Sequence, residues 1–166
     1  MQMQPTSIPA MQLTPEQLES MRSIGLRLDR GGTFWHLGER VTHARLREAL
    51  LRWLDIRDGD GRDIIRLDER RYAYVEVEDA HLRALSARWE DDRCWVDWDD
   101  GSEDELAYDS LRQGHDHAMY ARVRGKLRGR IGGPAYYTIA ERVEEDGRGG
   151  FSLAAAGRRW TIENAR

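Results

Sequence analysis

The chain has little cysteine and no long hydrophobic run. Cys94 is the one cysteine among 166 residues, which excludes an intrachain disulfide and any paired-cysteine metal or redox motif. The uninterrupted apolar runs are only a few residues long, which excludes a membrane-spanning helix. Residues 1–13 lack the charged start and apolar centre of a signal peptide. We therefore expect a flexible tail at 1–13 and a cytoplasmic protein.

Lysine is almost absent as well. Lys126 is the single lysine among 26 basic residues, and all the others are arginine, a bias typical of a GC-rich genome. The 30 acidic residues outnumber the basic ones and give a formal net charge of −4. Because a general nucleic-acid binder is expected to be clearly basic, nucleic acid is an unfavoured partner.

The charges are unevenly placed along the chain. Residues 84–110 hold ten acids and two arginines, a net charge of −8, and residues 111–131 hold six bases and one acid, a net charge of +5. Adjacent blocks of opposite sign usually neutralise each other across a fold or a dimer interface. The pattern therefore indicates internal pairing or a homodimer.

The N-terminal part reads as a mixture of helices and hairpins. Thr14 is a good helix cap, with Pro15 in the first turn and Gln17 closing a capping box, and this helix is expected to end near Gly25. A hairpin over residues 26–38 follows, with its turn at two glycines.

A second, amphipathic helix is the clearest element. It is predicted to be capped by Thr42, and its apolar residues recur at helical spacing as one core-facing stripe: Leu46, Ala49, Leu50, Trp53 and Leu54. A turn dense in Gly and Asp ends it, and two strands are predicted over residues 64–67 and 72–78.

A domain boundary is predicted near residue 80, where the alternating pattern ends. Strands are then expected over residues 83–89, 94–98, 104–110 and 119–124, followed by a helix at 134–144 and a hairpin around Gly157. The predicted fold class is α+β. An N-terminal α+β domain spans 14–80, and a mostly antiparallel β domain with one helix spans 81–166.

Two motifs suggest metals. The turn at 58–69 has acids at several calcium-loop positions, but Arg62 and Asp63 occupy the fifth and sixth positions, which excludes an EF-hand. His115 and His117 are two residues apart, so on a strand both imidazoles would share a face and could reach one metal. The alternative is an exposed histidine pair in a polar loop.

The stretch at residues 122–133, RVRGKLRGRIGG, carries five alternating cations: Arg122, Arg124, Lys126, Arg128 and Arg130. It does not match a phosphate-binding Walker loop, and a GxxG match at 129–132 is a weak sign of RNA binding. One interpretation is solvated charge that pairs with the acidic block. The other is a site for a small anionic ligand formed by Arg122, Arg124, Lys126 and Arg128, with Tyr136 or Tyr137 shaping the pocket.

Catalytic signatures are missing. The sequence has no GxSxG elbow and no nucleophile with a nearby histidine, and no catalytic residue or cofactor is predicted. The favoured hypothesis is a non-enzymatic binding module that self-associates. A binding protein or enzyme for an anionic, phosphorylated ligand is the alternative.

The order of these stretches resembles one bacterial family, the domain of unknown function twelve-eighty-five (DUF1285). The resemblance covers residues 25–163 and lies in four segments, 32–54, 60–82 with its Val77-Glu78-Asp79 signature, 119–143 and 152–162. After this signature the family carries Pro-Phe, whereas this chain has Ala80-His81. The resemblance implies an N-terminal α+β domain and a mostly β C-terminal domain, with no established activity. It also implies that the basic strand ends near Gly125 and turns, so that Leu127 and Ile131 pack together.

Overall fold

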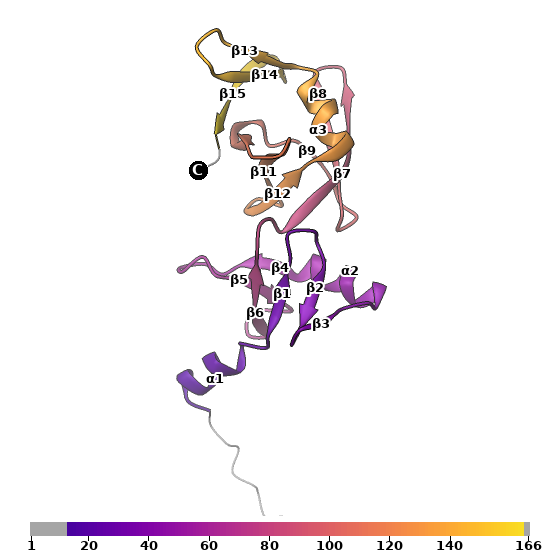
Figure 1. Ribbon diagram of the computed structural model, residues 1–166. Coiled ribbons are helices and arrows are strands. Elements are labelled where there is room, and N and C mark those ends of the chain that lie inside the picture. Colours follow the sequence, from indigo (N-terminus) through magenta and orange to yellow (C-terminus); the bar gives the residue numbers. More distant parts are fainter. Residues whose placement is uncertain (1–12, 165–166) are drawn as a thin grey trace, which may run out of the picture.

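The computed structural model describes residues 13–164, which form two β-sheets placed one after the other along the long axis of the molecule (Figure 1). Three α-helices accompany the sheets, so the predicted α+β class is confirmed. The predicted flexible tail lies almost entirely outside the described residues. No helix within 13–164 is long and apolar enough to cross a membrane.

The first helix, α1 (Pro15–Met21), begins as its capping box predicts. The Thr14 hydroxyl accepts a hydrogen bond from the Gln17 N–H, and the Gln17 side chain accepts one from the Thr14 N–H. The helix ends at Met21 and not near Gly25. The Tyr74 N–H donates to the Arg22 carbonyl, and this contact ties the chain to the first sheet before another turn can form.

The N-terminal sheet has six strands in the order β3-β2-β1-β6-β5-β4. The β1–β6 pair is parallel and the others are antiparallel. The hairpin and the two strands predicted in this region are present. The strands are β1 (Leu26–Leu28), β2 (Phe34–His36), β3 (Glu39–Arg40), β4 (Leu54–Ile56), β5 (Asp63–Arg66) and β6 (Tyr72–Val77).

Helix α2 (Ala44–Trp53) differs from the prediction at its start. Its cap is His43, whose Nδ1 accepts from the Leu46 N–H, and not Thr42. The buried face consists of Leu50 and Leu51, whereas Leu46 is exposed. The helix is buried only toward its C-terminal end, so the predicted stripe was wrong in its first turn.

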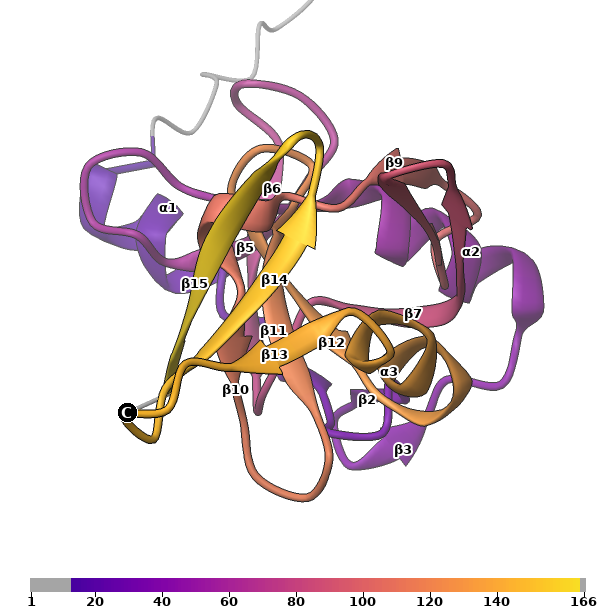
Figure 2. The same cartoon turned by 90° about the horizontal axis from the view of Figure 1, so that it is seen from above.

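The C-terminal sheet has nine strands in the order β13-β14-β15-β10-β11-β12-β7-β8-β9. Only the β15–β10 and β12–β7 pairs are parallel, so the sheet is mostly antiparallel, and it is strongly curved (Figure 2). Its strands are β7 (Leu82–Glu90), β8 (Arg93–Trp98), β9 (Glu103–Glu105), β10 (Arg112–Gln113), β11 (Met119–Val123), β12 (Leu127–Ile131), β13 (Val143–Glu145), β14 (Phe151–Ala155) and β15 (Arg158–Asn164). The closing hairpin predicted around Gly157 is β14–β15.

Two predicted elements of this half are shorter than expected. The strand predicted at 104–110 gives way to a short 3₁₀ helix, η1 (Tyr108–Ser110). The helix predicted at 134–144 is α3 (Gly133–Ala140), which packs beside β7. Its predicted last turn is instead strand β13, because pairing with β14 outweighs the local helical pattern.

The basic stretch forms a hairpin. Strand β11 ends at Val123 and the chain turns through Gly125, as the family resemblance implied. Residues 127–131 then form β12, which pairs with β11 in antiparallel register. Leu127 and Ile131 therefore both lie on the buried face of strand β12, which corrects the expectation that they pack together after the turn.

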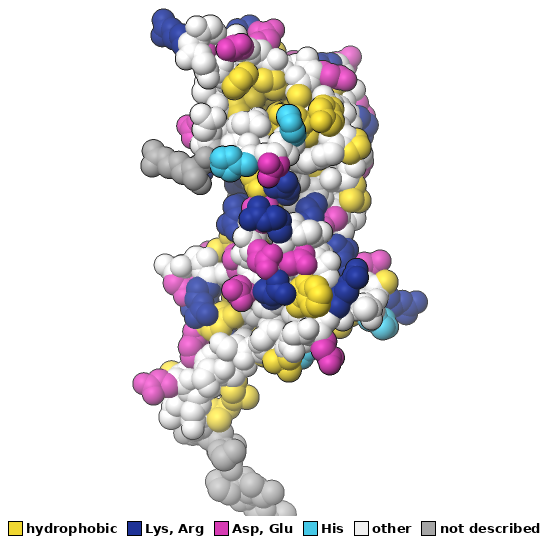
Figure 3. All heavy atoms as spheres, in the orientation of Figure 1, with side chains coloured by type: hydrophobic (Ala, Val, Ile, Leu, Met, Phe, Trp, Pro, Cys, Tyr) yellow, Lys and Arg dark blue, Asp and Glu magenta, His cyan; other side chains and the backbone are white. Residues whose placement is uncertain are grey.

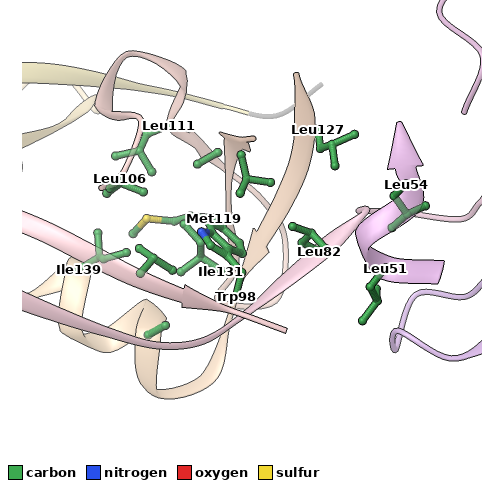
Figure 4. Packing of buried hydrophobic residues seen from close by; sticks show 14 of the residues in the cluster. Leu51, Leu54, Leu82, Trp98, Leu106, Leu111, Met119, Leu127, Ile131 and Ile139 are labelled. Carbon is green, nitrogen blue, oxygen red and sulfur yellow. The ribbon is translucent and has the colours of Figure 1, made fainter. Parts of the chain in front are cut away.

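A continuous apolar core crosses from one sheet to the other. Leu51 and Leu54 of the N-terminal half belong to the same buried cluster as Leu82 and Leu127 of the C-terminal half (Figure 4). The chain passes between the sheets at residues 78–81, where the sequence predicts a boundary. Independent folding of 14–80 and 81–166 stays a prediction.

Candidate functional site

The outer face of the β11–β12 hairpin is cationic. Arg122 of β11 and Arg128 of β12 are direct cross-strand neighbours, and Arg130 lies opposite Tyr120. Arg122 and Arg128 are both exposed, while the opposite face of both strands is buried. Like charges directly opposite each other destabilise a sheet. The stability of the hairpin therefore does not explain why this face carries two facing arginines.

Arg124 lies in the turn of this hairpin and points to the end of α2. Its Nη1 donates to the Leu51 carbonyl at 2.9 Å, and its Nη2 donates to the Arg52 and Leu54 carbonyls at 2.8 and 3.0 Å. Nη1 also lies 3.4 Å from Oδ2 of Asp100, whose side chain is 4% exposed. A cation that satisfies the last carbonyls of a helix also interacts favourably with its dipole. Arg124 therefore joins the two halves as a helix cap.

Lys126 makes a second contact between the halves. Its Nζ donates to the Ile56 carbonyl and to Asp55 Oδ1, both at 2.9 Å. Burial would raise the pKa of Asp55, but hydrogen bonds from Lys126, its neighbouring backbone N–H and Arg66 outweigh burial and hold that pKa below its ordinary value.

His81 forms a buried bridge between the sheets. Its Nδ1 accepts a hydrogen bond from the Arg128 backbone N–H at 2.9 Å, so the ring proton sits on Nε2. Nε2 then donates to Asp63 Oδ1 at 2.7 Å. The side chain is fully buried. This bridge fixes the backbone of Arg128 relative to the N-terminal sheet.

The acidic block accounts for part of the basic stretch. Arg122 pairs with Asp109 at 3.1 Å, and Arg124 pairs with Asp100. Lys126 and Arg130 instead meet acids of the N-terminal half, Asp55 and Asp79. The predicted internal neutralisation is therefore present for two of the cations. Arg128 and Arg130 face a hollow between the halves.

This waist hollow has a volume of about 360 Å³. Lys and Arg side chains gather at the waist between the two sheets (Figure 3). The residues lining the hollow come from the loop after β1, the connection after β6, strands β10 to β12 and the loop after β10: Arg30, Asp79, Arg112, Gly114, His115, Asp116, Tyr120, Arg128 and Arg130.

A hydrogen-bonded triad forms one wall of the waist hollow. The Tyr120 hydroxyl lies 2.9 Å from both carboxylate oxygens of Asp79 and accepts from Arg130 Nη1 at 2.8 Å. The pKa of Tyr120 is raised mainly by burial and secondly by the hydrogen bond to Asp79, and the hydrogen bond from Arg130 partly offsets this rise. Arg30 approaches the same carboxylate at 4.0 Å. Asp79 is thus within ion-pair distance of two arginines, Arg30 and Arg130.

The hollow carries an excess of positive charge. Four arginines and two aspartates line it. Within residues 13–164, no ion pair or hydrogen bond engages the Arg112 guanidinium, and Arg128 meets only the backbone carbonyl of Asp79, at 3.0 Å from its Nε. A neighbouring hollow of about 440 Å³ shares Arg112, Tyr120 and Arg128 and also includes Arg122 and Lys126. Guanidinium groups in such a recess suit phosphate and carboxylate oxygens.

The predicted ligand residues are only partly brought together. Arg128 lines the waist hollow, and Arg122 and Lys126 line its neighbour, whereas Arg124 lines neither. Tyr136 and Tyr137 lie on α3 and line neither hollow. The Tyr136 hydroxyl lies 3.5 Å from the Gln113 amide nitrogen, and Tyr137 is 61% exposed.

The histidine pair lies beside the hollow. His115 lines it, while the His117 ring meets the edge of the Tyr136 ring with centroids 6.0 Å apart. Asp116 and His117 have φ angles of 58° and 53°, so this segment is a loop and the face-sharing of a strand does not apply. Within the described residues, no group of three or more His, Cys, Asp or Glu is placed to hold a metal ion. A metal role for the pair stays a prediction.

Several lining residues were not singled out from the sequence. Arg30 and Arg112 come from two separate segments, and no local pattern distinguishes them from other charged residues. Asp79 ends the Val77-Glu78-Asp79 signature but was not assigned to a site. Arg130 is already one of the five alternating cations of the basic stretch, and Tyr120 lies one step of the same alternation before Arg122. This alternation alone could therefore have added both residues to the predicted site.

Comparisons with known proteins place this geometry in a known fold. No family model and no curated protein matches the sequence. The crystal structure of a DUF1285 family protein from Silicibacter pomeroyi DSS-3 is similar, with a TM-score of 0.69 and 19% identity over 85% of this chain and 79% of that chain. A DUF1285 family protein from Shewanella baltica OS155 has a TM-score of 0.59 and 17% identity over 72% of this chain and 93% of that chain. The chain therefore has the fold of these DUF1285 family proteins, as its sequence resemblance predicted.

Proposed function

We propose that this protein binds a small molecule through a phosphate or carboxylate group held in the waist hollow. The observation that carries the proposal is the pair Arg112 and Arg128, two guanidinium groups that line one recess and meet no carboxylate within residues 13–164. Hydrogen bonds between charged groups are stronger than those between neutral ones. An anion between these arginines would also relieve the repulsion between Arg128 and its cross-strand neighbour Arg122.

The two arginines have separate roles in this proposal. Arg112 stands on the short strand β10, and its guanidinium is free to turn toward a ligand. Arg128 is held more firmly, since its backbone N–H is bound to buried His81 and its Nε to the Asp79 carbonyl.

A thermal-shift screen with sulfate, phosphate, pyrophosphate and citrate tests this proposal. We expect at least one anion to raise the melting temperature of the wild type at constant ionic strength. The double variant Arg112→Gln/Arg128→Gln should lose the rise. Arg159→Gln should keep it, because Arg159 lies on β15 and is paired with Glu144. An equal rise in all three proteins, or a rise in none, would contradict the proposal.

Self-association is a second candidate function, suggested by the acidic and basic blocks of the sequence. Four of the five cations in the basic stretch find acidic partners within the chain, which leaves less unmatched charge for a second copy. Sedimentation velocity at low and high salt tests it. A salt-sensitive dimer would support this candidate, and a monomer at every concentration would contradict it.

A further inference from the structure

A second recess opens beside the waist hollow and differs from it in chemistry. This side hollow has a volume of about 360 Å³ and shares Arg30 and Arg130 with the waist hollow. Beyond these two arginines its wall includes Ala84, Leu85 and Pro134, and no carboxylate lines it. Arg83 also lines it, but its guanidinium is engaged by the carbonyls of the loop after β1.

Leu85 is turned outward by an irregularity in its strand. The pairing of β7 with β8 shifts between Ala84 and Ser86, so Leu85 is an extra residue without a cross-strand neighbour. Such a β-bulge changes the direction of side chains and is common beside binding sites. Leu85 is 63% exposed. The bulge thus places a large apolar side chain in the wall of a recess that adjoins a cluster of arginines.

We propose that the ligand is an anionic amphiphile, an organic phosphate or carboxylate whose apolar body lies in the side hollow. This inference rests on the proposed function, because the anionic head occupies the waist hollow between Arg112 and Arg128. The apolar body passes Arg30 and Arg130, the residues common to both recesses, and contacts Leu85 and Pro134. Burial of these side chains by the ligand supplies affinity that inorganic anions lack.

Two phosphate monoesters with the same head group test this inference. Calorimetry with methyl phosphate and hexyl phosphate compares a ligand that fills only the waist hollow with one that reaches the side hollow. We expect hexyl phosphate to bind about tenfold more tightly, since burial of a few methylene groups is enough for that ratio. Hexyltrimethylammonium, which carries the same chain and the opposite charge, should not bind.

The variants separate the two recesses. Leu85→Ser should bring the two dissociation constants close to each other while methyl phosphate binds as before. Leu67→Ser is the matched control, because Leu67 is 51% exposed and lines neither hollow, and it should keep the tenfold ratio. A preserved ratio in Leu85→Ser would overturn the inference.

The remaining outcomes are equally decisive. Equal binding of both esters by the wild type would remove the apolar subsite and leave the proposed anion site standing, whereas no binding of either would remove both. Binding of hexyltrimethylammonium would show adsorption of the chain alone and overturn the inference. Phosphatidic acid vesicles distinguish a soluble ester from a membrane lipid. We expect no co-sedimentation, because the recesses lie at the waist between the two sheets, and vesicle binding without hexyl phosphate binding would overturn the inference.

Discussion

Replacement of Arg124 by alanine should destabilise the whole molecule, because this one guanidinium holds the hairpin of the C-terminal sheet against helix α2. It donates to three carbonyls at 2.8 to 3.0 Å and neighbours Asp100, whose side chain is 4% exposed. Hydrogen bonds from a charged donor contribute roughly 1.5–3 kcal/mol each, and removing one member of a buried pair leaves the other without compensation.

The expected loss is smaller than the sum of these contacts. The Arg124 side chain is 29% exposed, so water replaces part of the lost hydrogen bonding. We expect the free energy of unfolding to fall by about 2–4 kcal/mol. With a urea m-value of roughly 2 kcal/mol/M, the midpoint of urea unfolding should fall by about 1–2 M.

Arg122→Ala is the matched control for this experiment. Arg122 is two residues away on the same hairpin, but its side chain is 44% exposed and pairs only with exposed Asp109. Its removal should change the free energy of unfolding by about 0–1 kcal/mol. Urea unfolding monitored by circular dichroism measures both effects. Equal losses for the two substitutions would refute the assignment of Arg124 as a cap between the halves.

Three further predictions concern stability and chemical reactivity. Gly129→Ala should lower the free energy of unfolding by about 1–3 kcal/mol, because a Cβ there would lie 2.3 Å from the Trp98 ring; thermal unfolding that matches the wild type would contradict this. The Cys94 thiol should not react with a disulfide reagent until the protein unfolds, because it is fully buried and burial raises its pKa to about 12, and rapid labelling of the native protein would show that this packing is wrong. The folded-state pKa of Asp55 is lowered, so its stabilising contribution is present above the ordinary value of about 3.9 and is lost as pH falls through the lower folded pKa. Lys126→Met should therefore reduce the fall in the free energy of unfolding at acidic pH. An unchanged dependence of this free energy on pH would argue against the ion pair between Asp55 and Lys126.

Local chemistry explains which elements of the fold could be predicted. The capping box of α1 involves residues three apart, and the hairpins are marked by glycine-rich turns between alternating strands. The start of α2 was missed by one residue because both Thr42 and His43 can accept a hydrogen bond at a helix start. The helix predicted to reach residue 144 failed because Val143 and its neighbours pair with β14, a contact that the local pattern does not contain.

The residues of the candidate site could likewise be predicted only where a local pattern in the sequence marks them. The alternation of charge in the hairpin predicted an exposed basic face that includes Arg122 and Arg128. The role of Arg124 could not be predicted, because it depends on the carbonyls at the end of a helix about 70 residues earlier. Arg112 was missed for a similar reason, since only the folding of β10 beside β11 brings it to the hollow.

The most direct test of the anion site is a calorimetric titration of methyl phosphate into the wild type and the Arg112→Gln/Arg128→Gln double variant. We expect saturable binding of one phosphate per chain by the wild type, weakened by added salt as expected for charged groups near the surface. The double variant should show no measurable binding at the same concentrations. Identical isotherms for the two proteins would contradict the claim that these arginines hold an anion.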